Sequence, residues 1–323
     1  MTPPVIALVA VGVSLIATPL AILVARRTGI VDRPGLLKRQ TTTVPYLGGV
    51  AVFCGVVVGV VVGHPWLGLP LACALALGVA DDRGDLSPWV RLAGEVAIGL
   101  IVAATCHVHL PAVVAWPSVV VVTVLLINGV NLMDGLDMLA AGVSAAAALG
   151  FALVVHGGGR DLAVALVGAL AGFLVFNRPP ARIYLGDGGS YLLGAALAVL
   201  MSLSWSGSVH RSTGVAALAL VAIPVAEVTC AIIRRRRAGQ SLLAGDRGHP
   251  YDRMVARGRS ALTASLSYIV LQALITCIVV LVVLVVHVGS VGVAVIVDVL
   301  VAVLVLIAAS LVGGLTPDAE VHP

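Results

Sequence analysis

Six of the 15 acidic residues lie in three short polar segments, each bordered by long apolar runs. Carboxylates and carboxamides at this density supply ligands for a metal ion and hydrogen-bond partners for a phosphorylated ligand, so these segments are the first candidates for a site. The polar side chains of the three segments are Asp81, Asp82, Asp85, Asn128, Asn131, Asp134, Asp137, Asn177 and Asp187.

The first segment places three carboxylates within five residues. If the helix end continues, offsets of three and four bring Asp82 and Asp81 alongside Asp85. Carboxylates so close repel one another unless a cation joins them, and Mg²⁺ takes oxygen ligands. The segment therefore indicates a metal site, and a solvated turn or helix cap is the alternative.

The second segment repeats a polar side chain every third residue from Asn128 to Asp137. This spacing places them along one face of a helix or of an interrupted helix. The set suits a nucleobase, sugar hydroxyls or a hydrated metal, and a structural network between helices is the alternative. In the third segment Asp187 sits in a glycine-rich turn, which lets a phosphate approach the backbone, although a plain turn also favours glycine.

A further polar loop, residues 246–253, combines Arg247 with the titratable ring of His249. A solvated loop histidine is the ordinary alternative. The preceding run Arg234 to Arg237 is typical of a topology signal that contacts anionic lipids.

Membrane helices must position these groups. The 323 residues are 60% hydrophobic and only 11% charged, with a mean hydropathy of +1.13, which excludes a soluble cytosolic protein. A membrane span needs about 20 apolar residues. The sequence predicts an all-α polytopic bundle of about 11 transmembrane helices, at residues 4–25, 46–63, 67–80, 89–106, 113–128, 138–156, 162–176, 191–206, 213–233, 261–286 and 291–313.

Basic residues predict the orientation of this bundle. With the N-terminus outside, the inner loops hold 17 of the 19 Lys and Arg residues, and the C-terminus is cytoplasmic. All three polar segments then face the cytosol. We expect a single transmembrane domain over residues 1–315 and a short cytoplasmic tail over 316–323, with two acids, Glu227 and Asp298, inside spans.

Five motifs in this order resemble the polyprenyl-phosphate N-acetylhexosamine-1-phosphate transferases, the glycosyltransferases of family 4. The similarity covers residues 29–254. The motifs are D-R-P at 32–34 leading through Lys38 to P-Y-L-G-G at 45–49, D-D-R-G-D-L-S-P at 81–88, N-G-V-N-L-M-D-G-L-D at 128–137, N-R-P-P-A-R-I-Y-L-G-D-G-G-S at 177–190, and D-R-G-H at 246–249.

The resemblance implies a reaction. A sugar 1-phosphate, expected to be N-acetylhexosamine 1-phosphate, passes from a UDP-sugar to a membrane polyprenyl phosphate and UMP is released. The cofactor implied is Mg²⁺, with Mn²⁺ as a substitute, and the location is the bacterial inner (plasma) membrane with the active site on the cytoplasmic face. Membrane lipids and a second copy in a homodimer are the expected partners, and nucleic acid is not.

The resemblance also assigns roles residue by residue. Asp81 is the expected base or orienter of the lipid phosphate, Asp82 its partner, and Asp187 the metal ligand. The remaining assignments are uridine contacts for Lys38 and Asp137, the polar floor of the cleft for Asn128, Asn131, Asp134 and Asn177, and donor phosphate or sugar contacts for Arg247 and the catalytic His249.

Some positions depart from the family pattern. Met138 stands where glycine is usual, Glu227 occupies a usual aspartate position, and residues 250–252 replace a histidine cluster that helps to distinguish the family's branches. Leu37, Gln40 and Glu95 differ from the usual Arg, His and Gln. Eleven spans with a cytosolic C-terminus favour the N-acetylglucosamine branch, and a muramoyl-pentapeptide transferase-like lipid I synthase is the alternative.

The rival from another class is a secondary transporter. Its ionisable sites would lie near the bilayer midplane on broken helices, whereas the acidic segments here border the inner loops. A CDP-alcohol phosphotransferase requires D-x-x-D-G-x-x-A-R, but residue 131 is Asn and no Ala-Arg pair follows Gly135. A structural membrane protein without a ligand leaves the ordered motifs unexplained.

Overall fold

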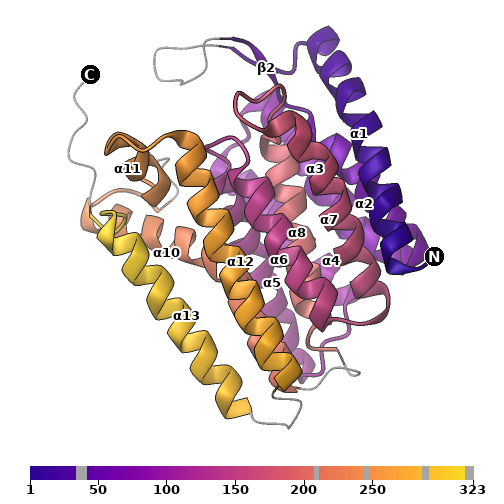
Figure 1. The fold of residues 1–323 in the computed structure, drawn as a ribbon, viewed down its shortest axis with the longest axis vertical. Helices are drawn as coiled ribbons and strands as arrows, with labels where there is room; N and C mark the ends of the chain where they lie inside the picture. The colour runs from indigo at the N-terminus through magenta and orange to yellow at the C-terminus, as the bar shows by residue number, and fades with distance from the viewer. Residues whose placement is uncertain (34–41, 207–210, 243–247, 286–290, 317–323) are drawn as a thin grey trace.

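The computed structural model describes residues 1–33, 42–206, 211–242, 248–285 and 291–316. Within them the chain is mainly α-helical, with one pair of short strands (Figure 1). The elements in chain order are α1 Pro3–Thr28, β1 Val31–Asp32, β2 Val44–Pro45, α2 Gly48–Val62, η1 Pro65–Leu67, α3 Gly68–Gly84, α4 Pro88–Thr105, α5 Ala112–Met133, α6 Leu139–Val154, α7 Gly157–Asn177, α8 Gly186–Leu203, α9 Arg211–Ala216, η2 Ala217–Val221, α10 Ala222–Arg237, α11 Pro250–Ala256, α12 Ala261–Val285 and α13 Val291–Leu311.

Each of the eleven predicted apolar segments coincides with helical structure. In the described parts of the chain, eight helical stretches are long and apolar enough to cross a membrane. The other three, α2, α3 and α6, have 15, 17 and 16 residues. The prediction of an all-α polytopic membrane protein is therefore confirmed, whereas the count of eleven spans stays a prediction.

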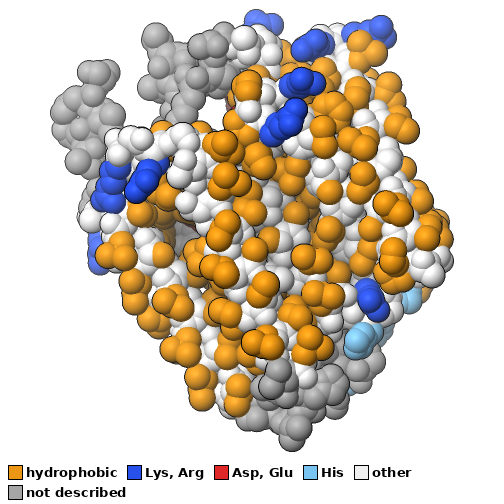
Figure 2. All heavy atoms as spheres, viewed as in Figure 1, with side chains coloured by type: hydrophobic (Ala, Val, Ile, Leu, Met, Phe, Trp, Pro, Cys, Tyr) orange, Lys and Arg blue, Asp and Glu red, His pale blue; other side chains and the backbone are white. Residues whose placement is uncertain are grey.

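Helix α8 forms the centre of the bundle. It packs against α2, α3 and α5, while α1 and α2 cover α7 and α6 joins α7 to α12. Most of α8 is buried, but α12 and α13 leave most of their apolar side chains partly or fully exposed. Such a surface suits lipid, and Figure 2 shows hydrophobic side chains over most of the visible face.

Glycines let α8 approach its neighbours closely. A Cβ atom on Gly78 of α3 would overlap the backbone of Asp187, and one on Gly49 of α2 would overlap the backbone of Gly189. Small residues at helix contacts permit this approach in membrane proteins. The start of α8 is thereby held between α2 and the end of α3, where two of the acidic segments meet.

The predicted span at 213–233 is one helical stretch with a 3₁₀ turn, η2, between α9 and α10. Pro224 lacks the N–H that would bond to the carbonyl of Leu220, four residues earlier. That carbonyl instead accepts a hydrogen bond from Gln272 Nε2 of α12 at 3.1 Å. The irregularity thus has a local cause and a tertiary partner.

Four arginines hold the C-terminal end of α13. Arg234 donates to the carbonyl of Gly314, Arg237 to that of Leu315, Arg253 to that of Thr316 and Arg257 to that of Leu311. Cations favour a helix C-terminus because its carbonyls lack partners there. Part of the basic run at 234–237 therefore has a structural task besides the one expected from sequence. Most of the predicted tail, residues 317–323, lies outside the described residues.

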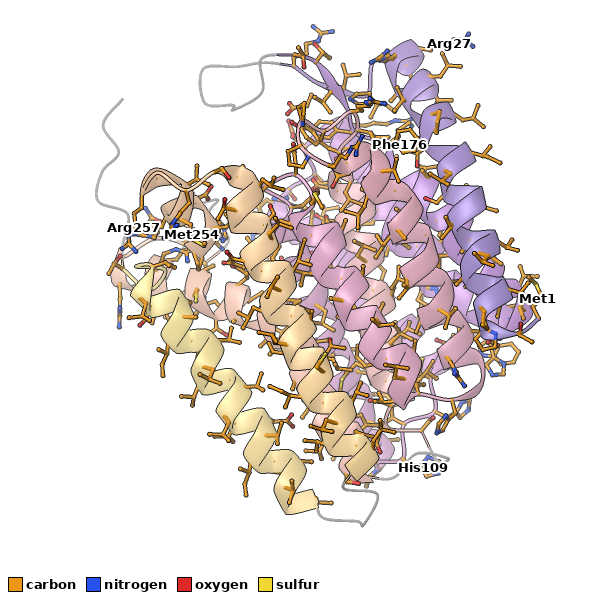
Figure 3. All side chains as sticks on the ribbon, viewed as in Figure 1. Met1, Arg27, His109, Phe176, Met254 and Arg257 are labelled. Atoms are coloured by element: carbon orange, nitrogen blue, oxygen red, sulfur yellow. The ribbon has the colours of Figure 1, made fainter. Side chains whose placement is uncertain are left out.

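The basic side chains gather toward one end of the bundle (Figure 2). Arg27, after the apolar part of α1, and Arg257, after α11, lie in the upper half of Figure 3, whereas His109 lies at the opposite end. The acidic segments at the ends of α3 and α5 and the start of α8 share the end that carries Arg27.

Candidate active site

Asp81 is the most heavily bonded member of the predicted site. It lies in the last turns of α3 and is buried. Its Oδ1 accepts from the backbone N–H of Leu86 at 2.9 Å, and its Oδ2 accepts from Tyr191 Oη at 2.7 Å and from Arg91 at 3.3 Å. Three donors keep its carboxylate fixed, and the Arg91 pair offsets its charge.

Asp82 caps the N-terminus of α8. Its Oδ1 and Oδ2 accept from the backbone N–H groups of Asp187 at 2.9 Å and Gly188 at 3.0 Å. The first N–H groups of a helix lack partners within it, and a negative charge is stabilised there. Asp82 therefore fixes Asp187 beside Asp81, and its expected catalytic partnership with Asp81 stays a prediction.

Asp187 faces Asn131 across the interface of α8 and α5. Asn131 Nδ2 donates to Asp187 Oδ1 at 2.7 Å and lies 3.1 Å from Ser190 Oγ. The carboxylate of Asp187 also lies within electrostatic reach of that of Asp81. Two neighbouring carboxylates repel one another, and a proton or a cation between them relieves this repulsion.

Asp134 and Asp137 follow α5 and adjoin the same cluster. Asp134 lies within electrostatic reach of Asp187, Asp82 and Asp137, and burial together with these neighbours raises its pKa well above the ordinary range. Its carboxylate has no hydrogen-bond partner among the described residues. Asp137 Oδ2 accepts from the N–H of Ala181 at 2.9 Å, and burial raises its pKa.

Asn177 joins two loops rather than facing Asp187. Its Oδ1 accepts from the N–H of Met138 at 2.9 Å and its Nδ2 donates to the carbonyl of Ile183 at 2.9 Å. Met138 has a φ of 67°, in the left-handed region that favours glycine. This conformation is the physical reason why glycine suits the position and why the departure noted in the sequence carries a strain.

Asn128 is directed away from the aspartates. Its Nδ2 donates to Glu95 Oε2 of α4 at 2.6 Å and to the carbonyl of Val124 at 2.9 Å. This pair matches the alternative considered from sequence, a network between helices. A substrate-binding role for Asn128 stays a prediction.

Sequence reasoning missed several partners of the carboxylates. Arg91 lies in α4 and Tyr191 in α8, ten residues and 110 residues from Asp81. Two further tyrosines, Tyr46 and Tyr184, lie with ring centroids 6.2 Å apart near the cluster. Burial and nearby aspartates raise the pKa of Tyr184 to about 12, so it stays a neutral donor. Tyr46 lies in the P-Y-L-G-G motif at 45–49 and Tyr184 in the motif at 177–190, so their place in the family motifs could have identified them from sequence.

His249 lies buried in a separate cluster. Its Nδ1 is 3.0 Å from Glu227 Oε2, and its ring stacks on Tyr251 with centroids 5.3 Å apart and planes at 6°. Tyr251 in turn donates to the carbonyl of Leu132 at 2.8 Å, just before Asp134. The loop of His249 is therefore anchored against the second polar segment. Lys38 and Arg247 lie outside the described residues.

The donor set can be tested against the predicted metal ion. Among the described residues, no three His, Cys, Asp or Glu side chains are arranged as a complete metal site. Mg²⁺ usually needs only one or two carboxylates because it keeps waters and takes phosphate oxygens. Asp187 fits such a partial site, because its Oδ1 is held by a hydrogen bond from Asn131 and a second carboxylate, Asp81, lies beside it.

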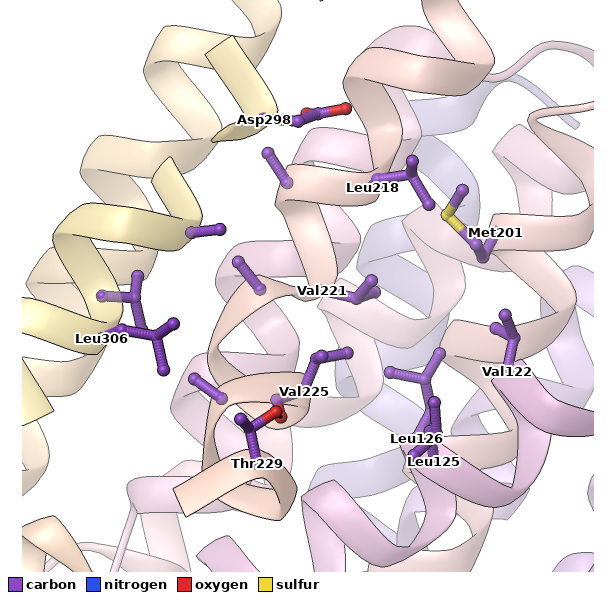
Figure 4. A pocket seen from close by; sticks show the side chains of 15 residues that line it. Val122, Leu125, Leu126, Met201, Leu218, Val221, Val225, Thr229, Asp298 and Leu306 are labelled. Carbon is purple, nitrogen blue, oxygen red and sulfur yellow. The ribbon is translucent and has the colours of Figure 1, made fainter. Parts of the chain in front are cut away.

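An apolar cavity of about 310 Å³ opens between α5, α8, η2, α10 and α13 (Figure 4). Its walls are mainly Val, Leu and Ala, and Asp298 and Thr229 lie on it as well. A cavity with these walls suits a hydrocarbon chain better than a polar ligand.

The comparisons with known proteins indicate the family of the chain. The sequence model of glycosyl transferase family 4 matches residues 65–204. The chain is similar to a probable undecaprenyl-phosphate N-acetylglucosaminyl 1-phosphate transferase of Bacillus subtilis, with 30% identity over 76% of this chain and 75% of the relative. It is 27% identical to the undecaprenyl-phosphate alpha-N-acetylglucosaminyl 1-phosphate transferase of Escherichia coli strain K12 over 80% of this chain and 78% of the relative. The Yersinia pestis enzyme of the same name shows 28% identity over 79% and 77%. The motifs, the helical membrane fold and these similarities together place the chain in glycosyl transferase family 4.

Proposed function

We propose that the chain transfers a sugar 1-phosphate, N-acetylhexosamine 1-phosphate, from a UDP-sugar to a membrane polyprenyl phosphate and releases UMP. The observation that carries this proposal is the meeting of Asp81 and Asp187 at the contact of α3 and α8, against Asn131 of α5. Both substrates are polyanions, so carboxylates crowded at one helix end would repel them unless a cation lay between the carboxylates and the phosphates.

Asp187 would hold Mg²⁺, with Mn²⁺ as a substitute, and Asp134 lies near enough to act on the same ion or its waters. When bound, the ion would offset the repulsion between the phosphates and stabilise charge on the leaving UMP. The chain's own groups orient the reactants. Asp81, fixed by its three donors, would accept the proton of the lipid phosphate or hold that phosphate in line with the donor.

The remaining groups divide between the two substrates. Tyr46 and Tyr184 present aromatic rings beside the aspartates, which suits a uracil ring. The cavity lined by Val225 and Leu306 would take part of the isoprenoid chain. Asp137, Lys38, Arg247 and His249 complete the proposed donor side, and Asn177 belongs to the polar floor of the cleft, where it holds two loops together.

The proposal includes a topology with eleven spans, the N-terminus outside and the C-terminus in the cytoplasm of a bacterial plasma membrane. The clustering of basic side chains toward the end that holds the aspartates supports it, because Lys and Arg are enriched in cytoplasmic loops (Figure 2). A cytosolic UDP-sugar then meets the lipid headgroup at this end. The proposal treats residues 1–315 as one domain and allows a homodimer.

The experiment uses the purified chain in lipid nanodiscs containing undecaprenyl phosphate. It is incubated with Mg²⁺ and, in separate reactions, with labelled UDP-N-acetylglucosamine, UDP-N-acetylgalactosamine and UDP-N-acetylmuramoyl-pentapeptide. We expect label in the lipid, one UMP released per sugar transferred, and loss of both on chelation. Preference for the muramoyl donor would instead favour the lipid I synthase alternative.

A secondary transporter is less well supported by the geometry. Glu227, a carboxylate within a predicted span, is bonded to His249 and Tyr268 inside the protein. Uptake of a UDP-sugar by sealed vesicles without release of UMP would support transport and contradict the transferase.

A further inference from the structure

Glu227 lies buried where α10, α11 and α12 meet. Its two oxygens have different partners: Oε2 is 3.0 Å from His249 Nδ1, and Oε1 accepts from Tyr268 Oη at 2.7 Å. The side chains of Glu227 and His249 are only 3% and 5% exposed. Burying a carboxylate costs desolvation free energy, and satisfied hydrogen bonds offset that cost, as they do here.

The distances decide which nitrogen of His249 carries a proton. Arg234 Nη2 also lies near Nδ1, at 3.5 Å, but Arg234 Nη1 donates to the carbonyl of Gly314 at 2.9 Å. A carboxylate only accepts and a guanidinium only donates, so Nδ1 cannot serve both. The shorter contact, to Glu227, is satisfied when Nδ1 carries the proton.

The same cluster is joined to the carboxylate site. The ring of His249 stacks on Tyr251, whose hydroxyl donates to the carbonyl of Leu132. A Cβ atom on Gly135 would overlap that hydroxyl, so the segment around Asp134 lies directly against Tyr251. The orientation of the His249 ring is therefore fixed relative to this segment by Glu227 on one side and Tyr251 on the other.

We infer that Glu227 is a positioning residue for His249: it holds the proton on Nδ1, so that Nε2 is the nitrogen that acts on a phosphate or sugar oxygen of the donor, and it stabilises the imidazolium. A carboxylate that fixes the tautomer of a histidine and supports its charge in this way recurs in enzymes. This inference rests on the proposed function, because it is the transfer reaction that gives His249 a substrate.

Other charged or titratable groups face this pair. Arg234 of α10 opposes the imidazolium, whereas Glu227 favours it from a shorter distance. Tyr251 of α11 and Tyr268 of α12 contribute ring contacts and one hydroxyl donor. Cys230 of α10 also lies within electrostatic reach of Glu227. Among the described residues after α13, the Gly314 carbonyl acts on the pair through Arg234. The carboxylate is therefore the group whose removal should shift the titration of His249.

The test combines Glu227→Gln and His249→Ala in a double-mutant cycle, with kcat and KM measured for UDP-N-acetylglucosamine over a range of pH. We expect Glu227→Gln to lower kcat/KM at least tenfold in the wild-type background and less than twofold in His249→Ala. The limb of the pH profile that disappears in His249→Ala should move about one unit to lower pH in Glu227→Gln, because an opposite charge favours the protonated ring. Glu227→Asp should recover part of the rate.

Two further variants guard against misfolding. Tyr268→Phe keeps the carboxylate and removes one donor to it, so the loss should be smaller and in the same direction. Asp161→Asn removes a carboxylate from the start of α7, the end of that helix opposite Asn177, and should stay within twofold of wild type. Each variant is first checked for a single peak in size-exclusion chromatography.

An independent readout is the ¹⁵N spectrum of histidine-labelled protein, with the His249 signals assigned by their loss in His249→Ala. We expect the Nδ1–H tautomer in wild type and a lower titration midpoint in Glu227→Gln. Equal losses of kcat/KM in both backgrounds, or an unchanged midpoint, would overturn the inference. A wild-type protein that transfers no sugar phosphate would contradict the proposed function, and the spectrum would still decide the pairing.

Discussion

The contact between Gly78 and the start of α8 permits a sharp test of how the site is assembled. In Gly78→Ala the new Cβ atom overlaps the backbone carbonyl of Asp187, whereas ordinary contacts begin at about 3.4 Å. Backbone cannot rotate away as a side chain does, so α3 and α8 must separate by on the order of 1 Å, a displacement that can cost about 100-fold in rate. Overpacking of this kind also costs about 1 to 3 kcal/mol of stability.

The assay is transfer of labelled sugar phosphate to lipid, together with the thermal midpoint in detergent. We expect kcat to fall about 100-fold because Asp81 and Asp187 sit on the two helices that separate. Gly84→Ala, on the same helix, and Gly12→Ala, in α1, are matched controls, since a Cβ atom meets nothing within 4 Å at either position. A Gly78→Ala protein as active as these controls would refute the close contact as the device that assembles the site.

Three other substitutions test individual groups. Asp187→Asn should reduce turnover in the transfer assay at least about 100-fold, which corresponds to about 2.7 kcal/mol, and should leave expression unchanged. The control is Asp85→Asn, which changes an exposed carboxylate in the first polar segment and should stay near wild type in the same assay. Tyr191→Phe removes the 2.7 Å hydrogen bond to Asp81 and should lower kcat about tenfold with little change in the KM for the UDP-sugar, as steady-state kinetics would show. Met138→Gly should raise the free energy of unfolding by about 1 kcal/mol because it relieves a left-handed backbone at φ 67°, as thermal denaturation would reveal.

Each of these expectations has a contradicting result. Mg²⁺-dependent turnover near wild type in Asp187→Asn would remove Asp187 from the proposed metal site. A rise in the KM for the UDP-sugar as large as the expected fall in kcat in Tyr191→Phe would indicate that Asp81, the hydrogen-bond partner of Tyr191, acts on the sugar donor. A lower thermal midpoint in Met138→Gly would show that the Met138 side chain contributes more than its backbone strain costs.

Sequence predicted the helices well because a run of apolar residues is a strong and local signal. It could not predict that Asp82 caps α8 or that Tyr191 donates to Asp81, since these contacts join residues more than 100 positions apart. The glycines at 186–189 predict a turn that lets a phosphate approach, whereas in the structure these residues form the first turn of α8, where Gly188 and Gly189 permit close helix packing.

Local spacing also predicted only part of the site, because tertiary contacts decide where each polar side chain points. The three-residue spacing from Asn128 to Asp137 predicted one shared face, but Asn128 turns to Glu95 whereas Asn131 turns to Asp187. The helix that carries them ends at Met133, so the later members lie in a loop that spacing alone cannot place. For His249, the buried carboxylate of Glu227 became a partner only once α10 and α11 were packed together.

The central claim is that the aspartates at the junction of α3 and α8 serve transfer of a sugar phosphate to a lipid. The most direct measurement follows radiolabel from the β-phosphate of UDP-N-acetylglucosamine in nanodiscs with undecaprenyl phosphate and Mg²⁺, for wild type and for Asp187→Asn. We predict label in the lipid as a sugar diphosphate, one unlabelled UMP per event, and neither product with the variant. Label that stays in the aqueous phase with wild type, or equal transfer by the variant, would contradict the claim.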